Sequence, residues 1–103
     1  MSQETVYDEN LFIDLRKLVD RLDLARLQER ARKSPHGAVS LRFRNHEFWL
    51  KPGGLDKGAI ADKVARMYFH RVKGYDLHST DLLVDGERIP ERYRAYERET
   101  LLN

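Results

Sequence analysis

The sequence predicts an α+β fold, in which a ββαββ sheet packs on one helix and follows a long N-terminal helix. Three patterns predict it. Leucines recur at steps of four and three over residues 11–22, the spacing of one helix face. Apolar and polar side chains alternate over residues 39–43, the period of a strand. Asp85-Gly86 follows a short apolar run and is typical of a tight hairpin turn.

The N-terminal segment, residues 8–33, contains neither Gly nor Pro and is expected to be helical, with Asp8 as the N-cap. Leu24 and Leu27 leave the first leucine stripe. Either the helix breaks near Asp23, a suitable second N-cap, or it is contacted on two sides. An unbroken helix of about 26 residues would be about 39 Å long. That exceeds the core of so small a chain, so we expect a break, or a homodimer formed through helix 11–31.

Residues 39–51 are expected to form a β-hairpin that turns at Asn45-His46. In that register Arg42 faces Trp49 and Arg44 faces Glu47. One face of the hairpin is then apolar and directed at the core: Leu41, Phe43, Phe48 and Leu50. The opposite face is polar apart from one indole: Arg42, Arg44, Glu47, Trp49 and Lys51.

The rest of the chain predicts a second helix over residues 56–72, with Asp56 as its N-cap and Gly74 beyond its end. Strands follow at residues 82–84 and 87–89, and then a short helix over residues 91–98. At 103 residues we expect a single domain 1–103, with an N-terminal helix or helix pair (8–33), a core (38–90) and a charged C-terminal segment (91–103). Tyr93 and Tyr96 are expected to dock on this core rather than on a partner.

Without the first helix, the order of elements is hairpin, helix, strand, tight turn, strand. This order resembles the ubiquitin-like, or β-grasp, superfamily over residues 39–91, and most closely in the run Asp81 to Glu91. The chain departs from the family in its charged segment 92–102, where the last central strand would lie, and in its Leu102-Asn103 ending. The resemblance implies a domain that is not conjugated and that works through protein–protein contact.

Composition excludes several classes of protein. With no Cys, a disulfide scaffold, a thiolate zinc site and a cysteine nucleophile are ruled out. No apolar run approaches the length of a membrane span, and residues 1–4 lack the pattern of a signal peptide. We therefore expect a soluble, cytoplasmic protein with no membrane partner. The four histidines lie in different predicted elements, so we expect no metal, no cofactor, no catalytic residue and no enzymatic activity.

The outer face of the hairpin is the candidate binding surface, with Arg42, Arg44, Trp49 and Lys51 as its partner-binding residues. An aromatic ring among cations suits a protein contact, and it also suits single-stranded nucleic acid. A third possibility is that the N-terminal helix covers Trp49. Nucleic acid would also contact a polar stripe on the second helix: Lys63, Arg66, His70 and Lys73. We expect a small non-enzymatic adaptor, inhibitor or regulatory subunit that binds another protein, with nucleic-acid binding as the alternative.

Overall fold

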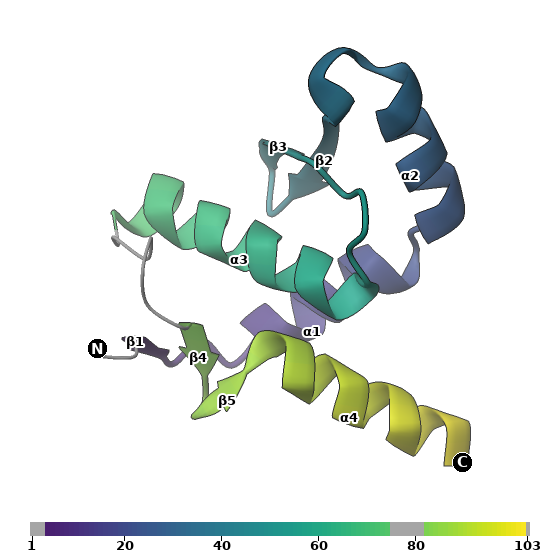
Figure 1. The fold of residues 1–103 in the computed structure, drawn as a ribbon. Helices are drawn as coiled ribbons and strands as arrows, with labels where there is room; N and C mark the ends of the chain where they lie inside the picture. The colour runs from purple at the N-terminus through teal and green to yellow at the C-terminus, as the bar shows by residue number, and fades with distance from the viewer. Residues whose placement is uncertain (1–3, 75–81, 103) are drawn as a thin grey trace.

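A computed structural model of the 103-residue chain describes residues 4–74 and 82–102. Its helices and short strands are interspersed along the chain (Figure 1). In order they are β1 (Glu4–Val6), α1 (Leu11–Asp20), α2 (Leu24–Lys33), a 3₁₀ turn (Pro35–Gly37), β2 (Val39–Phe43), β3 (His46–Leu50), α3 (Lys57–Lys73), β4 (Leu82–Val84), β5 (Glu87–Arg88) and α4 (Ile89–Leu102).

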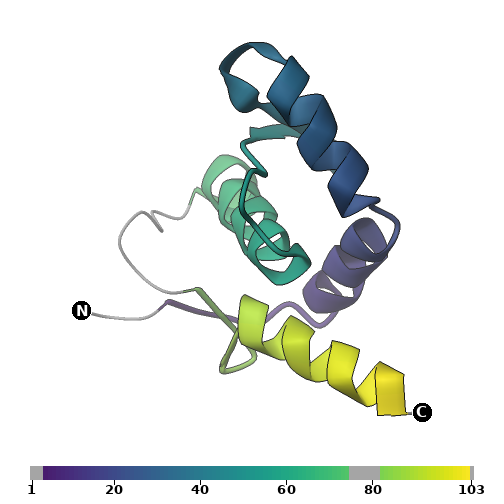
Figure 2. The same ribbon diagram turned by 45° about the vertical axis from the view of Figure 1, so that its right-hand side comes forward.

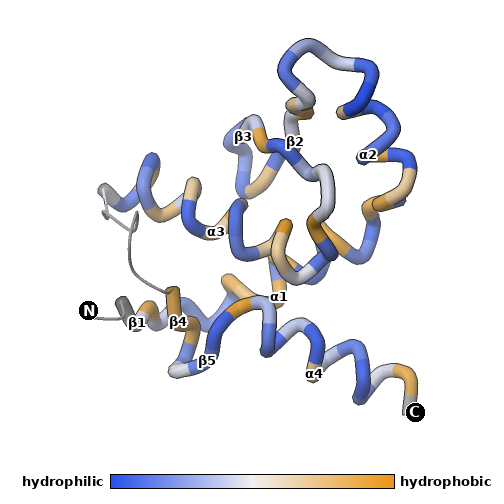
Figure 3. Tube along the Cα trace, viewed as in Figure 1, coloured by the Kyte–Doolittle hydropathy of each residue, from blue (hydrophilic) through white to orange (hydrophobic). Residues whose placement is uncertain are grey.

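Helix α3 lies in the middle of the molecule, between two layers. The β2–β3 hairpin and α2 lie on one side of it, and the small sheet with α4 lies on the other, in both views (Figures 1 and 2). α1 packs against α3 and links the two layers. Apolar positions of the chain concentrate where these elements face one another (Figure 3). Because α3 is contacted from several directions, most of its apolar face is fully buried: Ile60, Ala61, Val64, Ala65 and Phe69.

The mixed α+β composition is as predicted, but within residues 4–74 and 82–102 the strands form two separate sheets and not one ββαββ sheet. β2 pairs only with β3, antiparallel, while β1, β4 and β5 form a separate sheet with β4 in the centre. The centre strand is flanked by β1, a parallel partner that the sequence pattern did not predict. Three residues are too few for an alternation pattern, and the pairing of Thr5 with Leu83 joins distant parts of the chain.

The predicted long N-terminal helix is two helices, so its break near Asp23 is confirmed. α1 ends at Asp20, and the Asp23 carboxylate accepts a hydrogen bond from the Arg26 backbone N–H at 3.1 Å, as an N-cap does. The break lets each helix bury its own apolar side chains, with Leu15 buried in α1 and Leu27 in α2. The expectation that Asp8 caps the first helix was wrong, since the helix begins at Leu11 and Asn10 precedes it.

The ends of α3 are as the sequence predicts. The Asp56 carboxylate accepts a hydrogen bond from the Ala59 N–H at 2.8 Å, and Gly74 closes the helix with a positive φ of 74°. α4 is longer than the predicted 91–98, and its second residue is Pro90, a position where the missing N–H costs nothing.

The tyrosines of α4 dock on the protein itself, as expected. Tyr93 is buried and Tyr96 packs against the core. Both hydroxyls donate hydrogen bonds to the carboxylate of Asp20 on α1, that of Tyr96 at 3.1 Å. Burial, followed by the neighbouring Asp20, raises the pKa of Tyr93. The guanidinium of Arg16 lies 4.3 Å from the centre of the Tyr96 ring, so aromatic and charged contacts join α1 to α4.

Candidate functional site

The β2–β3 hairpin keeps the two faces that the sequence predicts, although its register differs. Phe43 pairs with His46 and Arg42 pairs with Glu47, so the turn residues are Arg44 and Asn45 rather than Asn45 and His46. The register is shifted by two residues from the prediction. Since side chains alternate with a period of two, that shift leaves each side chain on the same face. The residue opposite Trp49 is therefore Ser40, and the predicted pairing of Trp49 with Arg42 was wrong.

The prediction that Arg44 lies on the outer face of the hairpin was wrong. Arg44 occupies the first turn position with a positive φ of 49°, and its side chain leaves the outer face. The guanidinium donates hydrogen bonds to Asp8 at 2.9 and 3.3 Å and to Asp14 at 2.9 Å. It also lies over the ring of Tyr68, with 5.2 Å between the guanidinium carbon and the ring centre.

We call Asp8, Asp14 and Arg44 the Arg44 cluster. The hydrogen bond from Arg44 is the main reason that the pKa of Asp8 lies below its ordinary value. The same bond, with contributions from Tyr68 and Asp14, raises the pKa of Arg44. The cluster ties the hairpin turn to the residues that begin α1, and it thereby fixes the orientation of the hairpin on α3.

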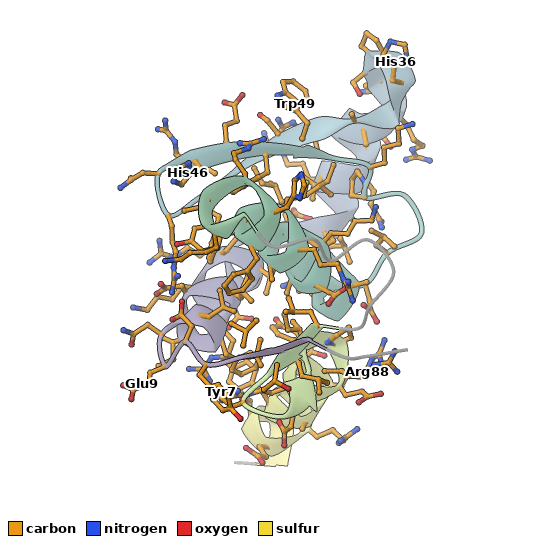
Figure 4. The ribbon with its side chains drawn as sticks, turned by 90° about the vertical axis from the view of Figure 1, so that its left-hand side faces the viewer. Tyr7, Glu9, His36, His46, Trp49 and Arg88 are labelled. Carbon is orange, nitrogen blue, oxygen red and sulfur yellow. The ribbon has the colours of Figure 1, made fainter. Side chains whose placement is uncertain are left out.

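Trp49 is the main exposed apolar side chain of the hairpin. Its exposed fraction is 61%, whereas its neighbours Phe48 and Leu50 are buried. The indole lies on the side of the hairpin that faces away from α3 (Figure 4). The N-terminal helices therefore do not cover it, and the third possibility raised by the sequence is wrong.

The surface around Trp49 is polar and carries two cations. Arg42 and Lys51 are both exposed, and within the described residues their side chains have neither an ion pair nor a side-chain hydrogen bond. Glu47 lies opposite Arg42, and its backbone carbonyl accepts a hydrogen bond from Arg71 at the end of α3. We call this set the hairpin surface: Ser40, Arg42, Glu47, Trp49 and Lys51.

A groove between α1 and β2 adjoins the hairpin surface through Arg42. It has a volume of about 460 Å³ and is lined by four cations, one carboxylate and three apolar side chains. We call it the α1–β2 groove: Asp14, Lys17, Leu18, Arg21, Leu22, Arg42, Phe43 and Arg44. A second groove of about 380 Å³ continues from Arg21 and Leu22 along α2, where Asp23, Arg26, Leu27 and Arg30 line it.

Several cations of α1 and α2 have no ion-pair partner among the described residues because the carboxylates beside them have other partners. Asp14 binds Arg44 of the hairpin, Asp20 binds the tyrosines of α4, and Glu29 pairs with Arg32 and Lys33. Asp23 caps its own helix. Within the described residues, four cations of this face make no ion pair and no side-chain hydrogen bond: Lys17, Arg21, Arg26 and Arg30.

The sequence analysis missed these four residues, although a signal was present. They form two pairs at a spacing of four, Lys17 with Arg21 and Arg26 with Arg30, and that spacing places the members of each pair on one helix face.

The predicted stripe on α3 is only partly available. Lys63, His70 and Lys73 are exposed, but Arg66 is half-buried and forms an ion pair with Asp62 at 2.8 Å. Arg66 also lines a pocket with residues of β4, β5 and α4, namely Leu82, Arg88, Pro90, Glu91 and Arg94. The pocket that Arg66 lines shares no residue with the two grooves on α1 and α2.

No metal site emerges from the described residues, which contain no group of three or more His, Asp or Glu side chains placed to hold an ion. His78, Asp76 and Asp81, which lie close together in the sequence, fall outside the described residues. Among the described helices, none combines the length and the apolar character needed to cross a bilayer. No family model, curated protein or solved structure matches the chain.

Proposed function

We propose that the chain is a non-enzymatic protein-binding module and that its contact surface is the hairpin surface. The observation that carries this proposal is the exposure of Trp49 between two unpaired cations, Arg42 and Lys51. Tryptophan and arginine dominate the binding energy of protein interfaces, because they combine a large apolar area with specific polar contacts. The indole is the anchor in this proposal, and the two cations bind polar or acidic groups around it.

The exposed area of the indole is sufficient for an interface hot spot. A tryptophan side chain buries roughly 150–250 Å², and 61% of this one is exposed. Covering about 120 Å² of apolar surface at about 25 cal/mol per Å² contributes about 3 kcal/mol. That value exceeds the about 2 kcal/mol that defines an interface hot spot.

The rigidity of the hairpin supports the same proposal. The Arg44 cluster holds the turn from one end, and Phe48 and Leu50 anchor β3 in the core from below. Trp49 is therefore presented by a strand whose neighbouring residues are fixed. A surface that needs little ordering on binding loses less conformational entropy.

The experiment is site-specific photo-crosslinking of the full chain in an extract of its source cells. A photoreactive aromatic amino acid replaces Trp49 in one variant, so that position 49 keeps an aromatic anchor. In the matched control it replaces Tyr7, an aromatic residue that is 83% exposed on another part of the molecule. We expect a discrete protein adduct at position 49 that is absent at position 7 and is lost when Arg42→Glu is added. Equal adducts at both positions, or none, would refute the proposal.

Nucleic-acid binding is the second candidate, because unpaired cations line two adjoining grooves next to an exposed indole. Trp49 is the single tryptophan of the chain, so its fluorescence reports directly on this surface. Single-stranded oligonucleotides that stack on it should quench its emission, and the affinity should fall steeply with salt. Removal of the crosslinked adduct by nuclease, together with such quenching, would favour this candidate over the first.

A further inference from the structure

The α1–β2 groove combines apolar side chains with exposed cations. We call its buried and half-buried apolar side chains, Leu18, Leu22 and Phe43, the floor, and its exposed cations, Lys17 and Arg21, the rim. Leu18 and Leu22 are only partly buried against the core, so each retains apolar surface that a ligand can cover. Charged residues around an apolar floor select a ligand that carries the opposite charge around an apolar side chain.

The charge of the groove is strongly positive. Its lining carries four cations against one carboxylate, that of Asp14. Asp14 is already hydrogen-bonded to Arg44 at 2.9 Å, and Arg44 also binds Asp8 outside the groove. The Arg44 cluster as a whole therefore offers no positive charge. The attraction for a ligand comes from Lys17, Arg21 and Arg42, whose side chains have no partner among the described residues.

One wall of the groove is an open strand edge. β2 pairs with β3 alone, so its other edge has no neighbouring strand among the described residues. In a hairpin with a two-residue turn, the pair of residues that flanks the turn, here Phe43 and His46, exchanges backbone hydrogen bonds between the strands. The next pair, Arg42 and Glu47, does not, so its backbone N–H and C=O groups point away from the partner strand. The contact of Arg71 with the outward carbonyl of Glu47 agrees with this alternation. The backbone of Arg42 is thus available to a strand that enters the groove.

We infer that the α1–β2 groove binds an extended segment of the partner protein in which acidic residues flank an apolar side chain. The apolar side chain covers Leu18 and Leu22, the acidic residues pair with Lys17, Arg21 and Arg42, and the backbone extends the edge of β2. This inference rests on the proposed protein-binding function and names the chemistry of the partner beside the hairpin surface.

An acidic peptide fits this groove better than a nucleic-acid strand does. Sequence-tolerant binding of single strands relies on aromatic side chains on which bases stack. The floor contains two leucines, and its single aromatic residue, Phe43, is buried. A phosphate backbone has no apolar group to place against Leu18 and Leu22, whereas a peptide does.

The experiment is a display selection of short random peptides on the immobilised full chain, followed by anisotropy titrations with the selected peptides. The groove variant combines Lys17→Glu with Arg21→Glu. The matched control combines Lys63→Glu with Lys73→Glu, which makes the same change of net charge at exposed positions of α3. The second groove variant, Lys17→Ser with Arg21→Ser, removes the cations without adding acids, and circular dichroism verifies that each variant is folded.

We expect the wild-type chain to enrich peptides with acidic residues around a Leu, Ile or Phe. The groove variant should bind them at least about tenfold more weakly, whereas the control should change affinity by less than about twofold at physiological salt. Enrichment of other sequences, equal losses in both variants, or displacement of the peptides by a single-stranded oligonucleotide at equal charge would overturn the inference. If the peptides fail while the adduct at position 49 is formed, the groove inference falls and the proposed function stands. If the adduct fails as well, both fall.

Discussion

Replacement of Arg44 by alanine should destabilise the fold far more than its place in a surface turn suggests. Arg44 binds Asp8 and Asp14, and all three side chains are partly shielded, with exposed fractions of 21, 24 and 34%. A hydrogen bond to a charged group contributes about 1.5–3 kcal/mol, and the lower value applies here because solvent screens the pairs. With two carboxylates the loss in the free energy of unfolding is about 3 kcal/mol.

The assay is thermal and urea unfolding followed by circular dichroism. For a chain of this length, 1 kcal/mol shifts Tm by about 4–8 °C, so Arg44→Ala should lower Tm by about 12–24 °C. The matched control is Arg42→Ala, which removes an exposed arginine of the same hairpin and should change the stability by less than about 0.5 kcal/mol. Equal effects of the two substitutions would refute the structural role of the Arg44 cluster.

The pH dependence gives a second readout of the same cluster. The hydrogen bond from Arg44 holds the pKa of Asp8 below its ordinary 3.8 in the folded state. The resulting stabilisation is present above pH 3.8 and is lost as the pH falls through the folded-state value. The difference in stability between wild type and Arg44→Ala should therefore narrow below pH 3.8.

Because Arg44 has a positive φ of 49°, Arg44→Gly should be about 1 kcal/mol more stable than Arg44→Ala.

Trp49→Ala should leave the stability within about 1 kcal/mol of wild type, whereas Phe48→Ala should lower it by about 3–5 kcal/mol in urea unfolding, because the two side chains lie on opposite faces of β3. Similar losses would contradict the assigned faces. Asp56→Ala should cost about 1 kcal/mol, while Asp56→Ser should recover most of it, since a serine still caps α3 but cannot pair with Arg94. Tyr93→Phe should cost about 1–2 kcal/mol, and ultraviolet titration of the wild type should show one tyrosine ionising above the ordinary pKa of 10.0. A wild-type titration without such a step, or one that keeps the step in Tyr93→Phe, would contradict burial of that hydroxyl.

The parts of the fold that follow from local sequence could be predicted. The faces of β2 and β3 depend on side-chain alternation, which a register shift of two residues does not change. Asp23 and Asp56 are N-caps because their carboxylates reach backbone groups three residues ahead, an interaction contained within one turn of chain. The exposure of Trp49 follows from the same alternation.

The parts of the fold that depend on residues distant in the sequence could not be predicted. β1 exists only because β4 is there to pair with it, and three residues carry no period of their own. The turn at Arg44-Asn45 places an arginine at a positive φ, which turn propensities disfavour. That position becomes acceptable because Asp8 and Asp14 receive the guanidinium, and nothing near Arg44 in the sequence indicates them.

The distribution of charge also depends on distant partners, and for this reason the sequence analysis did not identify the α1–β2 groove. By count, residues 1–33 are balanced, with seven basic and seven acidic side chains, while residues 34–75 have eight basic and three acidic. The count assigns the positive surface to the middle of the chain. In the fold, however, Asp14 neutralises Arg44 of that middle segment, and Asp20 is bound by tyrosines of α4. Among the described residues, Lys17 and Arg21 are then left without an ion-pair partner in the segment that the count calls neutral. A positive surface is thus determined by which carboxylates the tertiary structure engages, and in this protein those on α1 are bound by other elements.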